Sequence, residues 1–326
     1  MHAMQNLLCK TLGIELPIVQ APMNYIAGHA LAAAVSQAGG MGVIGLNAGK
    51  IKGEKLPMRE RLTREFERVR AATDKPVGVN IVVPDGENKS ALAYARAMVQ
   101  TAFEAGATTA FCVGGLQASL FEYVKALGMK LVVRPLTATV RQAREAQNMG
   151  ADAFVATGFD AGGVLPEHRI GTFSLVPAIV DAVTIPVLAA GGINDVRGVR
   201  AAFALGAQGV YVGTRFIATE ECAASPEAKA LICRLSGESM LQVSETLRSL
   251  PTDFASDCYV KHRLQPTAGS ATDLVSAART GMYDGTPDEG VVTVNTGVGL
   301  ITCVESAAAV IRELMADFLS DPNIRR

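Results

Sequence analysis

One short pattern repeats along most of this chain and limits what it can fold into. Between about residue 17 and residue 216, apolar or β-branched runs end at Gly, Ala or Asn, and an alanine-rich amphipathic stretch follows each run. The runs recur at intervals of roughly 20 to 35 residues, the length that one strand and one helix require. The runs that we expect to be β-strands are Pro17–Ala21, Gly42–Gly45, Val77–Ile81, Thr109–Val113, Lys130–Val133, Ala153–Ala156, Pro186–Ala190 and Gly209–Gly213.

The stretches between these runs have helical periodicity. In the stretch after the first run, Leu31, Ala34 and Val35 fall on one stripe before Gly39 and Gly40 end the pattern. Strands that are apolar along their whole length and alternate with helices are typical of a parallel sheet covered on both faces. Eight such units favour closure of the sheet, so we predict an α/β fold of the (β/α)8 TIM-barrel type.

The repeat ends after Phe216. Helical patterns at 226–234 and 239–249 and a stretch of small and polar residues at 266–273 follow, without another strand–helix unit. We therefore expect residues 217–290 to form a small, mostly helical C-terminal subdomain that covers the barrel mouth.

The last part of the chain predicts one more helix. Within residues 302–319, Val304, Ala308, Ile311 and Leu314 share one stripe, as in an amphipathic helix packed on a larger body. The predicted organisation is thus a barrel over 1–216, the subdomain over 217–290, and a C-terminal segment over 291–326 whose helix packs back on the barrel.

Charge and composition exclude several classes of partner. The 30 basic and 31 acidic residues nearly cancel, which offers no electrostatic footprint for nucleic acid or an anionic membrane. No apolar run approaches the length of a membrane span, and the N-terminus lacks the order of a signal peptide. The six cysteines form no CxxC pair. We expect a cytoplasmic protein with a small-molecule substrate; the oligomeric state stays open, with a homodimer as one outcome.

Two glycine turns point to a bound phosphate. Barrel enzymes act at the carboxyl ends of their strands, and phosphates often bind in the loops after strands seven and eight. Here the seventh predicted strand runs into Gly191–Gly192, and the eighth into Gly213–Thr214. Glycine lets backbone N–H groups approach an anion closely, and the Thr214 hydroxyl adds a donor. The helix after Asp195 is expected to direct its positive end at the same place.

A series of motifs in this order resembles a known family. The series consists of Pro17–Met23, Gly78–Asn80, Asp160–Gly163, Ala190–Ile193 and Gly213–Phe216. It is similar to the nitronate monooxygenase family, formerly called 2-nitropropane dioxygenases, which includes FMN-dependent enoyl-acyl-carrier-protein reductases. The likeness covers almost the whole chain and implies FMN as the cofactor.

The resemblance also implies which residues hold the flavin. Backbone at residues 21–23 would lie against the isoalloxazine ring, and Asn80 would bond the ring or the ribityl chain. Arg134 would place a positive charge near the ring, which stabilises the anionic reduced flavin. The implied cofactor-binding residues are Ala21, Pro22, Met23, Asn80, Arg134, Asp160, Gly162, Gly163, Ala190, Gly191, Gly192, Gly213 and Thr214.

One position departs from the family pattern. Family members of known type carry a histidine directly after the Ala-Gly-Gly that follows strand six, but this chain has Val164 there, and valine cannot transfer a proton. The candidates for a catalytic role are His168, four residues further on, and Tyr25, whose hydroxyl can reach the barrel mouth. His262 is a further candidate for substrate contact.

These observations predict an FMN-dependent oxidoreductase that oxidises a nitronate or reduces a quinone or activated alkene with NAD(P)H. Two alternatives stay open. One is a nucleotide-binding barrel of the inosine-monophosphate-dehydrogenase type, although the loop from Thr157 to Leu165 lacks the nucleophilic cysteine of that chemistry. The other is a flavin-binding protein without catalysis.

Overall fold

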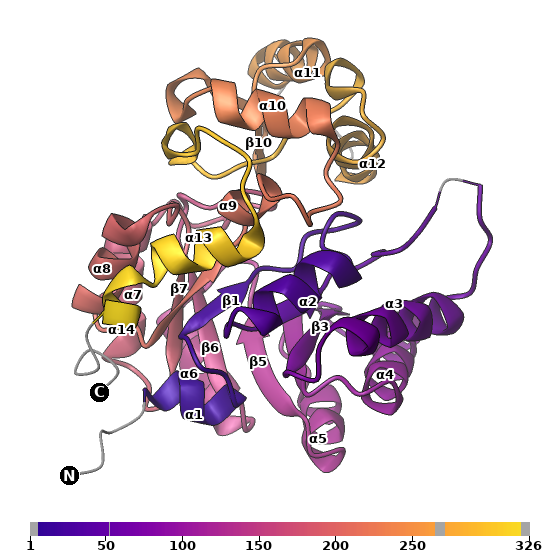
Figure 1. Ribbon diagram of the computed structural model, residues 1–326, viewed down its shortest axis with the longest axis vertical. Helices are drawn as coiled ribbons and strands as arrows, with labels where there is room; N and C mark the ends of the chain where they lie inside the picture. Colours follow the sequence, from indigo (N-terminus) through magenta and orange to yellow (C-terminus); the bar gives the residue numbers. More distant parts are fainter. Residues whose placement is uncertain (1–5, 52, 265–270, 321–326) are drawn as a thin grey trace.

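The fold was obtained as a computed structural model that describes residues 6–51, 53–264 and 271–320 (Figure 1). Parallel strands form one eight-stranded sheet in the order β1-β8-β7-β6-β5-β4-β3-β2. A parallel bridge between Val19 and Met41 joins the β1 and β2 sides, so the sheet is nearly closed, and the predicted TIM barrel is confirmed. The strands are β1 (Ile18–Gln20), β2 (Gly42–Ile44), β3 (Val77–Val83), β4 (Thr109–Gly114), β5 (Lys130–Arg134), β6 (Ala153–Thr157), β7 (Val187–Ala190) and β8 (Gly209–Val212).

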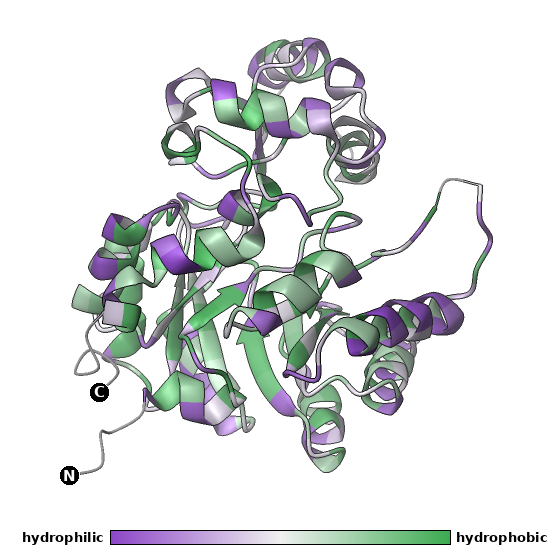
Figure 2. Ribbon diagram, in the orientation of Figure 1, coloured by the Kyte–Doolittle hydropathy of each residue, from purple (hydrophilic) through white to green (hydrophobic). Residues whose placement is uncertain are grey.

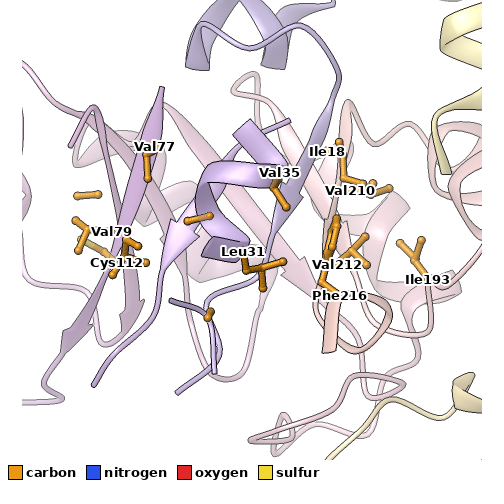
Figure 3. Packing of buried hydrophobic residues seen from close by; sticks show 14 of the residues in the cluster. Ile18, Leu31, Val35, Val77, Val79, Cys112, Ile193, Val210, Val212 and Phe216 are labelled. Carbon is orange, nitrogen blue, oxygen red and sulfur yellow. The ribbon is translucent and has the colours of Figure 1, made fainter. Parts of the chain in front are cut away.

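The strands are apolar along their length because both of their faces are buried. Side chains alternate between the two faces of a strand. Ile18, Val210 and Val212 point outward and gather with Phe216 under the surrounding helices (Figure 3). Between them in sequence, Val19 and Tyr211 belong to a separate cluster inside the barrel.

Helices cover the outer face of the sheet. Figure 2 shows apolar strands on the inside and helices such as α3 and α4 with polar residues on their outer sides. The short helix α1 (Leu7–Leu12) contributes Leu8 and Leu12 to the cluster inside the barrel. The remaining helices of the barrel are α2 (His29–Gln37), α3 (Met58–Ala72), α4 (Lys89–Glu104), α5 (Ala118–Ala126), α6 (Val140–Asn148), α7 (Thr172–Val180), α8 (Val196–Ala204) and α9 (Thr214–Ile217).

The elements between α9 and α13 (Ala307–Leu314) lie above the barrel in Figure 1. They are the helix α10 (Pro226–Arg234), the 3-10 turn η1 (Gly237–Ser239), the strands β9 (Leu241–Ser244) and β10 (Leu247–Ser249), the helices α11 (Asp253–Leu264) and α12 (Ala271–Met282), and the 3-10 turns η2 (Pro287–Glu289) and η3 (Val298–Leu300). We call residues 241–282, as far as the structure describes them, the lid.

The prediction of a helix at 239–249 is wrong. These residues form an antiparallel hairpin of β9 and β10. Leu241 and Val243 alternate with polar residues, which is the period of a strand and not of a helix. Part of the polar stretch predicted at 266–273 lies outside the described residues; from Ala271 it forms the start of α12.

The closing helix begins later than predicted. α13 (Ala307–Leu314) starts after Ser306, whose side chain accepts a hydrogen bond from the Ala309 N–H at 3.2 Å, and α14 (Ala316–Ser320) follows. Val304 is exposed and precedes the helix. The serine N-cap sets the helix start, and the buried stripe is Ala307, Val310, Ile311 and Leu314. In the described part of the chain, no helix combines the length and the apolar character of a membrane span.

Candidate active site

A cavity of about 940 Å³ opens at the carboxyl ends of the barrel strands and extends under the lid. The predicted cofactor residues line it, except Asp160 and Gly192. Tyr25 lines it as well, whereas His168 is exposed and does not. The lid contributes Leu247, His262 and Arg279 to the opposite side. The cavity therefore has a barrel half, made of strand ends, and a lid half.

At one end of the barrel half, backbone donors are free. Among the described residues, no carbonyl or side chain accepts a hydrogen bond from the N–H groups of Gly191, Gly213 and Thr214. Gly191 has a φ of 110°, and a Cβ there would lie 2.7 Å from the Thr172 hydroxyl oxygen, so no other residue fits without strain. Unbonded N–H groups that line one cavity can bind an anion such as phosphate.

The helix after the seventh strand contributes less than its position suggests. The side chain of Asp195 caps α8 and accepts hydrogen bonds from the N–H groups of Arg197 and Gly198 at 3.0 and 3.1 Å. Two N–H donors in the first turn of α8 are thus already bonded and are not available to a phosphate. Asp195 itself does not line the cavity.

A buried pair of asparagines fixes the two glycine turns relative to each other. The side-chain amides of Asn194 and Asn295 exchange two hydrogen bonds of 2.8 Å. The Asn295 N–H also donates to the Thr214 hydroxyl oxygen at 2.9 Å, which leaves the hydroxyl proton available to a ligand. Asn295 lines the cavity and was not found from the sequence, because its partners lie 81 and 101 residues away.

The barrel half also holds a partly buried cation. The Arg134 guanidinium donates from Nε to the Thr157 hydroxyl at 3.3 Å, and no carboxylate among the described residues pairs with it. Burial lowers the pKa of Arg134, and it also raises the pKa of the neighbouring Tyr211 phenol. Asn80 is buried beside the cavity, and its Oδ1 has no hydrogen-bond partner in the described structure. Asn80 and Arg134 together suit a polar, electron-accepting group.

The loop after β6 is held from both sides. The Asp160 carboxylate accepts a hydrogen bond from the Thr172 N–H at 2.6 Å, so this residue shapes the loop from outside the cavity. From the lid, Arg248 donates to the carbonyls of Phe159 and Ala161, and its guanidinium lies 4.7 Å from the centre of the Phe159 ring. Val164 pairs with Leu247 of β10 and faces the cavity.

The mouth of the cavity carries aromatic and basic groups. Tyr25 adopts a left-handed conformation with a φ of 64°, which is strained for a residue with a Cβ. The Arg279 guanidinium lies 5.2 Å from the centre of its ring, and the Tyr283 ring lies 6.1 Å from it. Arg279 in turn lies 3.4 Å from an Asp284 carboxylate oxygen. No group of three or more metal-ligating side chains occurs among the described residues.

Comparisons with known proteins agree with this geometry. The family model described as nitronate monooxygenase matches residues 5–317. The chain belongs to the nitronate monooxygenase family. Among its relatives, a probable nitronate monooxygenase of Staphylococcus haemolyticus is 34% identical over 269 residues, which covers 70% of this chain and 71% of the relative.

Solved structures of similar proteins extend the agreement to the whole fold. FabK from Thermotoga maritima superimposes with a TM-score of 0.82 at 31% identity, covering 96% of this chain and 95% of that one. A nitroalkane oxidase from Streptomyces ansochromogenes gives a TM-score of 0.76 at 25% identity, covering 96% and 98%. This member of the family is thus an enzyme, an oxidoreductase, and neither a barrel of the inosine-monophosphate-dehydrogenase type nor a protein without catalysis.

Proposed function

We propose that this oxidoreductase binds FMN in the barrel half of the cavity and uses it to reduce an apolar electrophile, a quinone or an activated alkene, with NAD(P)H. One observation carries the proposal. One cavity is lined both by the unbonded backbone N–H groups of Gly191, Gly213 and Thr214 and by the cation of Arg134, which pairs with no carboxylate among the described residues. A ligand with a phosphate and an electron-accepting ring satisfies both groups.

The residues present fit this cofactor. Gly191, Gly213 and Thr214 would hold the phosphate, and residues 21–23 would form the wall along the ring. Asn80, with its unpartnered oxygen, would accept a hydrogen bond from a ring or ribityl donor. Bound FMN supplies reversible two-electron chemistry, and a positive charge at Arg134 stabilises its anionic reduced form.

The lid half favours an apolar substrate. Val164, Leu247 and Val275 line it, and the loop after β6 presents no acid or base to the cavity between Ala161 and Val164. Burial of apolar surface is the main source of affinity in such a chamber. Tyr25 is placed at the mouth to donate a hydrogen bond to the substrate.

Nitronate oxidation is the second candidate. It is supported by the Staphylococcus haemolyticus relative, which is named a probable nitronate monooxygenase. A nitronate is already deprotonated, so its oxidation needs no base at Val164. The cations of Arg134 and Arg279 both line the cavity and suit an anionic substrate.

An anaerobic absorbance titration separates the two candidates. The flavin band near roughly 450 nm is followed while NADH, NADPH or a nitronate is added to the purified protein. Bleaching by a reduced nicotinamide, with return of the band on adding a quinone or enone, is the expected result. Bleaching by the nitronate alone would overturn the reductase and establish the second candidate.

A further inference from the structure

Apart from the Tyr25 hydroxyl at the mouth and the carboxyl groups of Asp85 and Glu245, the cavity walls carry few groups that can transfer a proton. Arginine stays protonated in proteins, and burial raises the pKa of Tyr211, which makes that phenol a poor donor. Of the three histidines in the described structure, His29, His168 and His262, one lines the cavity: His262 of α11. Histidine is the side chain most often used for proton transfer near neutral pH.

His262 has a carboxylate beside it. Its Nε2 lies 3.6 Å from Oε1 of Glu245, which lies in the turn between β9 and β10 and also lines the cavity. The His262 side chain is 15% exposed and that of Glu245 62% exposed, so the pair connects the cavity with solvent. A histidine with an orienting carboxylate is a recurrent arrangement for moving a proton.

The hairpin brings this pair to the loop after β6. Val164 pairs with Leu247, and the Leu165 N–H donates to the Thr246 carbonyl at 2.8 Å. Glu245 directly precedes Thr246 in the same turn. A short series of contacts thus leads from Val164, which cannot transfer a proton, through the hairpin to His262.

We propose that His262, positioned by Glu245, is the proton-transfer residue of this enzyme. The inference rests on the proposed reductase function. NAD(P)H would supply a hydride equivalent, that is two electrons and one hydrogen, which the acceptor would receive by way of bound FMN. The His262 imidazolium would donate the proton that completes the reduction, to an oxygen of a quinone or to the α-carbon of an activated alkene. The imidazole would then take up a proton from solvent.

Other charged groups surround the pair. Arg169, from the loop after β6, lies 3.2 Å from Glu245 and shares its charge. The helix that carries His262 has charged residues on either side of it, and η2, which packs against that helix, adds two acidic residues. These groups are Lys261, Arg263, Asp288 and Glu289.

The first test is kinetic and uses His262→Gln, with menadione as the acceptor and NADH or NADPH as the donor. The rate of acceptor reduction is expected to fall by about 100-fold. FMN binding and the anaerobic rate of cofactor reduction by the nicotinamide should stay within about twofold, because neither step needs this proton. Glu245→Gln, which removes the orienting charge, should lower the rate by about tenfold.

The matched control is His29→Gln. His29 also faces a glutamate, with Nδ1 3.1 Å from Glu65 Oε2, but it lies outside the cavity, so acceptor reduction should not change. In the background of His262→Gln, Val164→His places an imidazole on the facing loop and should restore part of the rate. If His168→Gln lowers the rate and His262→Gln does not, the proposal is overturned.

The second test does not depend on turnover. The chain has four histidines, so their imidazole NMR signals can be assigned by single substitutions. Menadione added to the oxidised protein without a nicotinamide should shift the His262 signals and leave those of His168 and His29 in place. Unmoved His262 signals at saturating menadione would overturn the role of His262, whereas absence of FMN binding would overturn the proposed function itself.

Discussion

The two halves of the cavity are built differently. The barrel half consists of the ends of strands whose side chains are largely buried. Its cavity-lining residues include Asn80 and Thr214, which are themselves buried. The lid half rests on a small apolar cluster that includes Val243, Leu247 and Ala255. Large apolar side chains of the lid remain exposed, with Leu264 77% exposed.

The difference suits the two halves to two tasks, binding of the cofactor in the barrel half and selection of the substrate in the lid half. Backbone donors and buried polar groups in a rigid frame suit a cofactor that every member of a family binds in the same way. The lid is thinly packed, and its cavity-lining side chains lie on helices and a hairpin. Its residues can be substituted without disturbing the barrel, as expected for a part that selects the substrate. Substitutions in the barrel half should therefore affect FMN, and those in the lid should affect the acceptor.

The largest effect is expected at Gly191. In Gly191→Ala, the left-handed backbone and the contact with Thr172 displace the turn, so FMN affinity should fall by about 100-fold in a calorimetric titration. Gly150→Ala is the control, because Gly150 has a φ of 87° but nothing near its Cβ and lies far from the cavity in the turn after α6. It should cost about 1 kcal/mol of stability and leave FMN affinity unchanged. Equal FMN affinity in both variants would contradict the role of this turn.

The asparagine pair should show strong coupling. Asn295→Ala leaves the buried Asn194 amide without a partner and should destabilise the protein by about 1–3 kcal/mol in urea unfolding. Asn194→Ala should have a similar effect. The double variant should lose clearly less stability than the sum of the losses in the two single variants. Additive losses would show that the pair does not act as a unit.

Arg134 should set the reduction potential. Arg134→Met removes the positive charge near the ring, so the potential of the bound flavin should become more negative by about 30 mV, equivalent to about 1.4 kcal/mol for two electrons. Arg134→Lys keeps the positive charge, so the reduction potential of the bound flavin should shift much less in this variant. Spectroelectrochemical titration measures both variants, and an unchanged potential in Arg134→Met would place the cation away from the flavin.

The smallest effect is expected at Val275 in the lid. Val275 lines the cavity but is 53% exposed, so Val275→Ala removes only part of a buried apolar contact. The KM for menadione should rise by about threefold, while FMN affinity stays the same. A loss of FMN affinity in this variant would erase the distinction between the two halves.

The sequence predicted the barrel well because its signals are local. Apolar runs and glycine turns act within a few residues, which placed all eight strands as well as the turns at Gly191 and Gly213. Features that depend on distant partners were missed. Asn295 connects the two glycine turns only through its hydrogen bonds with Asn194 and Thr214. Arg279 of α12 lines the cavity only because the lid folds over the barrel.

Two further errors, the helix predicted at 239–249 and the free positive end expected at α8, have local causes. The residues at 239–249 carry both helical and alternating patterns, and packing against the loop after β6 selects the hairpin. The positive end expected at the start of α8 is not free, because the Asp195 side chain caps the helix and accepts hydrogen bonds from the Arg197 and Gly198 N–H groups.

The most direct test of the account compares FMN with riboflavin. The two ligands share the ring and the ribityl chain and differ in the phosphate, which we assign to Gly191, Gly213 and Thr214. Calorimetric titration of the flavin-free protein should give an affinity for FMN at least about 100-fold higher than for riboflavin, because the phosphate gains several charge-assisted hydrogen bonds. Equal affinities, or no binding of either ligand, would contradict the central claim.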